Sequence, residues 1–150
     1  MKTLRVYVDT SVIGGCFDDE FAEASCALLD AVRKGKTILL LSDLLAIELQ
    51  RAREEVRRIV EDLPPASVEQ LLMSDESRYL HRAYLKAKVV GPRHAADAHH
   101  IALATVAKAD LMVSWNFKHI VHYDKIRLFN AVNLREGYPA IEIRSPQEVV

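Results

Sequence analysis

Short apolar, β-rich runs alternate with segments of helical spacing along this sequence, and this alternation constrains the fold more than any other feature. The three clearest runs cover residues 6–8, 37–41 and 111–113, and polar residues follow each of them directly. Runs of this kind are typical of strands that are buried on both faces. With helices between them, such strands predict a three-layer α/β/α sandwich around a central, mostly parallel sheet.

Apolar residues recur at helical spacing in the segments between these runs. Ser42 and Asp43 offer N-cap and first-turn chemistry, and Gly35 stands where a helix C-cap belongs. Residues 68–73 fit either a short helix or an edge strand. The expected helices cover residues 21–34, 43–60, 74–90, 95–108 and 125–134, and a last strand covers 141–143.

The length of 150 residues predicts one domain, residues 1–150, with a core that needs no metal or disulfide staple. Cys16 and Cys26 are too few for a disulfide framework, so we expect free, partly buried thiols. No apolar run is long enough for a membrane helix, and the first residues lack the apolar core of a signal peptide, which predicts a cytoplasmic protein with no membrane partner. The formal net charge of −1 excludes binding of a polyanion through overall charge, so such a partner would need a local site.

Asp9 is the strongest single candidate for chemistry, because it directly follows the strand predicted over residues 6–8. In parallel sheets, ligands bind beyond the carboxyl ends of the strands. Thr10 and Ser11 can orient the Asp9 carboxylate by hydrogen bonding; alternatively, Asp9 only caps the following turn. Asn116 stands just past a later predicted strand, so we expect Asp9 and Asn116 at the same edge of the sheet.

Two further carboxylates lie on predicted helices. Glu48 interrupts the apolar stretch 44–49, where a desolvated carboxylate is costly unless a cation or metal pairs with it. The alternative is a solvent-facing Glu48 that pairs with Arg51 or Arg53. Asp97 lies in the first turn of an Ala-rich helix, where interaction with the helix dipole would by itself explain it.

In this order, the motifs resemble those of the PIN domain, the fold of many VapC-type toxin ribonucleases. The resemblance spans nearly the whole chain and rests on residues 6–11, Glu48, residues 97–104 and residues 109–120. It implies that Asp9, Glu48 and Asp97 bind metal. The chain departs from the commonest pattern at Asn116, where PIN domains usually carry Asp. Some members carry Asn there, and its carbonyl can still bind a metal or a metal-bound water.

The resemblance implies a Mg²⁺- or Mn²⁺-dependent endoribonuclease whose catalytic and metal-binding residues are Asp9, Glu48, Asp97 and Asn116. These cations prefer oxygen ligands, relieve the repulsion between close carboxylates and activate water for attack on phosphorus. We therefore expect the three carboxylates within reach of one ion. The resemblance implies products with 5′-phosphate and 3′-hydroxyl ends. The resemblance also implies a toxin of a type II toxin–antitoxin pair, with an RNA substrate, an antitoxin partner and a homodimeric state. Because Asn116 brings no charge, a catalytically silent PIN-like module that binds RNA or protein is the alternative.

Residues near these motifs are candidates for substrate contacts. The expected contacts come from Thr10, Ser11, Arg93, Trp115, Lys118 and His119. Trp115 can stack on a base or pack in the core. For His94, His99 and His100, solvated or hydrogen-bonding side chains are a better explanation than a transition-metal site. Arginines within residues 51–58 alternate with acids, which indicates a solvated, salt-bridged helix face.

Overall fold

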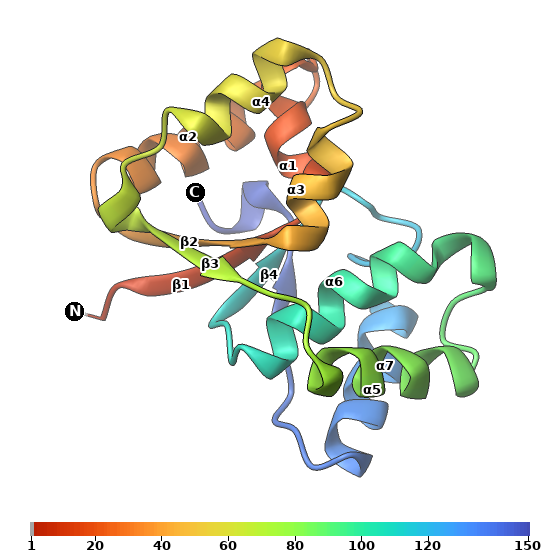
Figure 1. Ribbon diagram of the computed structural model, residues 1–150. Helices are drawn as coiled ribbons and strands as arrows, with labels where there is room; N and C mark the ends of the chain where they lie inside the picture. Colours follow the sequence, from red (N-terminus) through yellow and green to blue (C-terminus); the bar gives the residue numbers. More distant parts are fainter. Residues whose placement is uncertain (1) are drawn as a thin grey trace.

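A five-stranded parallel sheet forms the centre of the computed structural model, which describes residues 2–150 (Figure 1). In spatial order the strands are β3 (Val68–Leu71), β2 (Thr37–Ser42), β1 (Leu4–Val8), β4 (Leu111–Val113) and β5 (Ile143–Arg144). All four neighbouring pairs are parallel. Val8 pairs with Val113, so β1 and β4 end side by side, and Asp9 and Asn116 follow at the same edge, as predicted.

Helices cover both faces of the sheet, which confirms the predicted three-layer sandwich (Figure 1). One face carries α1 (Thr10–Gly14), α2 (Ala22–Arg33), α3 (Asp43–Leu49) and α4 (Glu54–Glu61). The other carries α5 (Asp75–Lys86), α6 (Ala95–Val106) and α7 (Tyr123–Arg135). Short 3₁₀ turns cover Gly15–Phe17, Pro65–Ser67, Pro92–His94 and Pro146–Glu148.

The core consists of two apolar clusters, one on each face of the sheet, because successive strand residues point to opposite sides. Tyr7, Leu40 and Met112 face α5, α6 and α7, whereas Val8 and Leu41 face α1 to α4. All five side chains are at most 4% exposed. The strands are thus buried on both faces, as their apolar sequences predict.

The helix predicted over residues 43–60 is two helices, α3 and α4. Ser42 caps α3 as predicted, because its Oγ accepts the backbone N–H of Leu45 at 3.1 Å. The chain turns after Leu49, and both α3 and α4 pack against α1. Arg53 has extended backbone angles before α4, and acidic residues in the first turn of α4 are the start signal that the prediction missed.

Smaller differences concern the edges of the sheet and the first turn. Residues 68–71 form the edge strand β3, which settles the open choice between helix and strand. The last strand lies at Ile143–Arg144, slightly later than predicted. The segment after Asp9, predicted as a polar turn, is the short helix α1. Cys16 and Cys26 are free, the first partly buried and the second exposed. Among residues 2–150, no helix is both long and apolar enough to cross a membrane.

Candidate metal and nuclease site

Asp9 is buried between two serine hydroxyls at the end of β1. It occupies the N-cap position of α1, but its side chain makes no capping hydrogen bond, so the alternative of a simple turn cap is wrong. Its carboxylate instead accepts hydrogen bonds from Ser11 Oγ at 2.5 Å and from Ser114 Oγ at 2.6 Å. Burial raises the pKa of Asp9 and the charge of Asp97 adds to this, whereas His100 and the two hydroxyls oppose it.

Glu48 extends from α3 toward the same edge and is one-third exposed. Its Oε1 accepts hydrogen bonds from Thr10 Oγ1 at 2.8 Å and from His100 Nε2 at 2.6 Å. Burial alone would raise the pKa of Glu48, but the hydrogen bond and charge of His100, with the hydroxyl of Thr10, hold it below its ordinary value. Arg53 pairs with Glu55 rather than with Glu48. The partners of the Glu48 carboxylate are therefore Thr10 and His100, not that arginine.

Asp97 lies in the first turn of α6 beside the polar turn that follows β4. The Nδ2 group of Asn116 donates to Asp97 Oδ2 at 3.1 Å, and His94 Nδ1 lies 3.7 Å from the same oxygen. Burial raises the pKa of Asp97, while nearby histidines, His100 foremost, oppose the rise. The Asp97 carboxylate therefore has specific partners in addition to the helix dipole.

Asn116 uses both ends of its amide. Its Oδ1 accepts the backbone N–H groups of Lys118 and His119, at 3.2 and 2.9 Å, while its Nδ2 donates to Asp97. Asn116 thus fixes the turn after β4 and the orientation of Asp97 together.

The histidines differ from the prediction in their burial. His99 and His100 are only 8% and 2% exposed, so they are not solvated, although their hydrogen bonding was expected. His100 was missed as a site residue; its position one helical turn after Asp97 was the available signal. Ser114 was missed as well, and its signal was its place after β4, which matches that of Asp9 after β1.

The three carboxylates do not meet at one point in this conformation. Among residues 2–150, no group of three His, Cys, Asp or Glu side chains is arranged to hold a metal ion. The structure therefore differs from the expectation that Asp9, Glu48 and Asp97 lie within reach of one ion. Serines, a histidine and an asparagine instead satisfy the three carboxylates separately.

Trp115 packs in the core rather than facing a substrate. It is 6% exposed, stacks on Phe21 with ring centroids 4.2 Å apart, and donates from Nε1 to Ser25 Oγ at 2.8 Å. This geometry favours the packing alternative over stacking on a base. Thr10 and Ser11 are likewise engaged by Glu48 and Asp9.

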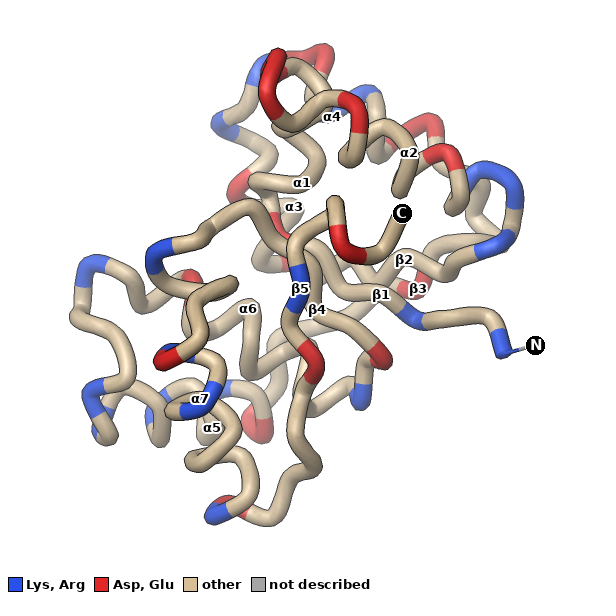
Figure 2. Tube along the Cα trace, turned by 180° about the vertical axis from the view of Figure 1, so that it is seen from behind, with Lys and Arg blue, Asp and Glu red and all other residues tan. Residues whose placement is uncertain are grey.

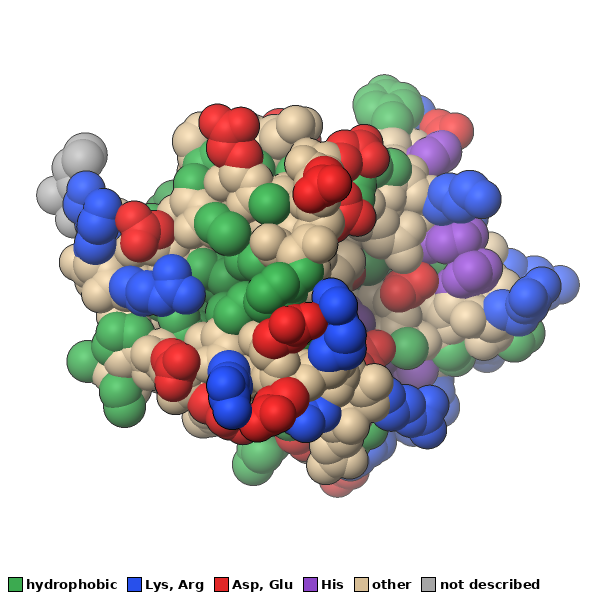
Figure 3. All heavy atoms as spheres, turned by 90° about the horizontal axis from the view of Figure 1, so that it is seen from above, with side chains coloured by type: hydrophobic (Ala, Val, Ile, Leu, Met, Phe, Trp, Pro, Cys, Tyr) green, Lys and Arg blue, Asp and Glu red, His purple; other side chains and the backbone are tan. Residues whose placement is uncertain are grey.

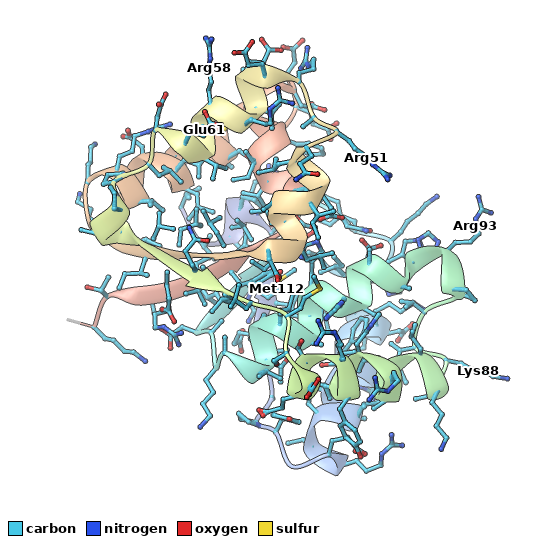
Figure 4. The ribbon with its side chains drawn as sticks, in the orientation of Figure 1. Arg51, Arg58, Glu61, Lys88, Arg93 and Met112 are labelled. Carbon is cyan, nitrogen blue, oxygen red and sulfur yellow. The ribbon has the colours of Figure 1, made fainter. Side chains whose placement is uncertain are left out.

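Arg93 and Lys118 are exposed and His119 is partly exposed, so these three remain candidates for phosphate contacts. His119 stacks on His94, with ring centroids 3.5 Å apart. Arg51 and Arg93 project outward on the same side, from the end of α3 and the start of α6 (Figure 4). Figure 3 shows histidine side chains beside Lys and Arg toward that side of the molecule.

Solved structures show which fold this is. One match is a chain in the crystal structure of VapBC2 from Rickettsia felis bound to a DNA fragment from their promoter, with a TM-score of 0.59 and 14% identity over 95% of this chain and 98% of that one. A second is in DNA-bound VapBC from Salmonella typhimurium, with a TM-score of 0.59 and 15% identity over 96% and 99%. A third is in FitAcB from Neisseria gonorrhoeae, with a TM-score of 0.56 and 13% identity over 95% and 98%.

No family model and no curated protein sequence matches the chain. The structural matches cover 95–96% of its length at 13–15% identity, so the likeness is one of fold and not of sequence. The chain has the PIN-like α/β fold that its motifs resemble, and the prediction of fold class is confirmed.

Proposed function

We propose that this protein is a Mg²⁺- or Mn²⁺-dependent endoribonuclease that hydrolyses RNA phosphodiester bonds with a metal-activated water. The proposal rests on one observation: oxygen donors from four separate segments gather at the carboxyl edge of a parallel sheet. These donors are Asp9, Glu48, Asp97 and Asn116. This edge is where folds of this class bind their ligands.

The chemistry of these donors fits a hard divalent cation. Mg²⁺ commonly takes one or two carboxylates together with waters and substrate phosphates, so it does not need three touching carboxylates. Asp9 and Asp97 both have raised pKa values because they are buried, and a nearby cation would offset that cost. Asp9, Glu48 and Asp97 are the residues from which the ion would take one or two carboxylate ligands, with waters completing its shell. When bound, it would supply Lewis acidity and a water of lowered pKa.

The protein's own groups prepare the site by fixing the carboxylates. Ser11 and Ser114 donate to Asp9, and Thr10 donates to Glu48, so these oxygens are oriented before any substrate arrives. Preorganised groups lower the cost of reorganisation during the reaction. Asn116 likewise orients the Asp97 carboxylate by donating a hydrogen bond to its Oδ2.

A local excess of positive charge favours an RNA substrate. From Asp75, where α5 begins, to Arg135, where α7 ends, the chain carries ten Lys and Arg residues but only five Asp and Glu. This segment forms α5, α6 and α7, so the positive charge lies on one side of the sheet although the net charge is −1 (Figure 2). Clustered positive charge attracts the phosphate backbone and makes binding dependent on salt.

We also propose that the protein is the toxin of a type II toxin–antitoxin pair and forms a homodimer. The fold shared with chains of VapBC and FitAcB, over 95–96% of this chain, supports an antitoxin partner. Exposed apolar side chains, including Ile47, Leu72 and Leu134 at 50–75% exposure, offer contact surface. Light scattering at high micromolar concentration should give the mass of a dimer, and a monomer would contradict the dimer proposal.

The alternative, a catalytically silent module that binds RNA or protein, is favoured by one observation: the Asn116 carbonyl is already used by the turn that follows it. A cleavage assay separates the two. The purified protein, incubated with a mixed-sequence single-stranded RNA, should cleave it with Mn²⁺ and not with EDTA. The Asp9→Asn variant should leave the RNA intact. RNA bound but uncut at every Mn²⁺ concentration would establish the silent module.

A further inference from the structure

A buried chain of hydrogen bonds leads from the protein core to Glu48. The hydroxyl of Tyr7 lies 2.8 Å from Ser42 Oγ and 2.6 Å from His100 Nδ1. The opposite ring nitrogen, Nε2, lies 2.6 Å from Glu48 Oε1. Tyr7, Ser42 and His100 are all at most 2% exposed, so water does not compete for these bonds.

With an ionised Glu48 and a neutral His100 ring, this network of hydrogen bonds has only one arrangement of donors and acceptors that uses every group. An ionised carboxylate only accepts, and His100 Nε2 lies 2.6 Å from Glu48 Oε1, so the proton between these two atoms belongs to Nε2. A neutral ring then accepts at Nδ1, and the donor there is the Tyr7 hydroxyl. Ser42 in turn donates to Tyr7, while its Oγ accepts from the backbone N–H of Leu45.

We propose that His100 is a positioning residue that donates its Nε2–H to Glu48, with its ring held in place by Tyr7 and Ser42. The proposal rests on the proposed function, since it names how one residue of that site is oriented. Ser42 also caps α3, the helix that carries Glu48. The same buried network of hydrogen bonds thus fixes both α3 and the Glu48 carboxylate, which lies at the exposed end of the network. It also links α3 to β1 and α6.

One alternative, a purely structural role for His100, is less consistent with these contacts. A purely structural core histidine would not face a one-third exposed carboxylate at 2.6 Å. Its neighbour His99 is such a structural residue: it stacks on His81, with ring centroids 4.4 Å apart, and lies 3.4 Å from Ser77 Oγ. His99 is therefore the matched control, a buried histidine on the same helix without a site carboxylate.

The first test needs neither metal nor substrate. Nitrogen-15 NMR of the imidazole groups should show His100 protonated at Nε2, and Glu48→Ala should shift that Nε2–H resonance. Tyr7→Phe should change the Nδ1 shift, whereas Glu48→Ala should leave the His99 signals in place. A ring protonated only at Nδ1, or an Nε2–H signal unmoved by Glu48→Ala, would overturn the proposal.

The second test measures Mn²⁺ affinity by calorimetry. Partners of metal-binding side chains typically contribute 10–100-fold to metal affinity. His100→Leu should therefore weaken Mn²⁺ binding at least about tenfold. His100→Gln, which retains an N–H donor toward Glu48, should recover most of the lost affinity. His99→Leu should lower stability but not Mn²⁺ affinity.

The two tests also keep this proposal separate from the proposed function. A folded His100→Leu variant with wild-type Mn²⁺ affinity would overturn the positioning role. If the wild-type protein binds no Mn²⁺, the proposed function fails, and the NMR result still decides whether His100 positions Glu48.

Discussion

The side-chain amide of Asn116 donates a hydrogen bond to Oδ2 of Asp97 across 3.1 Å. The carbonyl end of the same amide accepts two backbone N–H groups of the turn after β4. A carboxylate at position 116 would keep the turn, because its oxygens also accept. Toward Asp97, however, it would present a like charge in place of a donor.

Asn116→Asp should destabilise the metal-free protein and tighten its binding of Mn²⁺. The loss of the donor and the new repulsion at Asp97 should lower the free energy of unfolding at pH 7 by roughly 1–3 kcal/mol in EDTA. The added charge attracts the cation, so calorimetry should show a lower Kd for Mn²⁺. Asp9→Asn should move the affinity in the opposite direction. If Asn116→Asp leaves the affinity unchanged while Asp9→Asn lowers it, Asn116 lies outside the metal's ligand shell.

Asp9→Asn should raise the stability of the metal-free protein at neutral pH. The folded-state pKa of Asp9 is raised. At pH values between the ordinary and the raised pKa, the folded protein therefore binds more protons than the unfolded chain. Its stability therefore falls as pH rises through that window, and the loss is complete above it. Chemical denaturation in EDTA should show a gain of about 0.5–2 kcal/mol for Asp9→Asn at pH 7, shrinking as the pH falls toward 4.

The exposed Asp19 provides the control for that comparison. Asp19→Asn should leave stability within about 0.5 kcal/mol of the wild type across the same pH range. A difference between Asp9→Asn and the wild type that does not change with pH would show that the buried charge of Asp9 is not its origin.

Gly15→Ala should disrupt the packing of Trp115. A Cβ atom at Gly15 would lie 2.6 Å from Ser25 Oγ and 2.8 Å from Trp115 Nε1, the two atoms of their hydrogen bond. Such overpacking typically costs about 1–3 kcal/mol. Denaturation followed by the fluorescence of this single tryptophan should show that loss. Gly14→Ala, where a Cβ meets no atom within 4 Å, should be neutral or slightly stabilising; equal effects at both glycines would contradict the packing argument.

Arg93→Gln and Lys118→Gln should each weaken RNA binding and reduce its dependence on salt. Each exposed cation that contacts a phosphate adds roughly one unit to the slope of log affinity against log salt concentration. Fluorescence anisotropy in EDTA measures binding without metal-dependent cleavage. The control is Arg58→Gln on α4, since Arg58 points away from this side and pairs with Glu54 (Figure 4). A larger loss for Arg58→Gln would place the RNA elsewhere.

The strands and the edge that carries the site could be predicted because they depend on local patterns. Asp9 and Asn116 both follow apolar runs, and parallel pairing of β1 with β4 brings them to one edge. The partners of the carboxylates could not be predicted, because they depend on contacts between distant segments. Ser114 reaches Asp9 from 105 positions away, and His100 reaches Glu48 from 52 positions away.

The ends of the cleaved RNA test the central claim most directly, because they report the nucleophile. A metal-activated water attacking phosphorus in line leaves a 5′-phosphate and a 3′-hydroxyl, and requires the ion that Asp9 would help to hold. Attack by the RNA's own 2′-hydroxyl would instead leave a cyclic phosphate and a 5′-hydroxyl. Mapping the products formed with Mn²⁺ should show 5′-phosphates, absent in EDTA and with Asp9→Asn. Cyclic phosphate ends, or cleavage that persists in EDTA, would contradict the account.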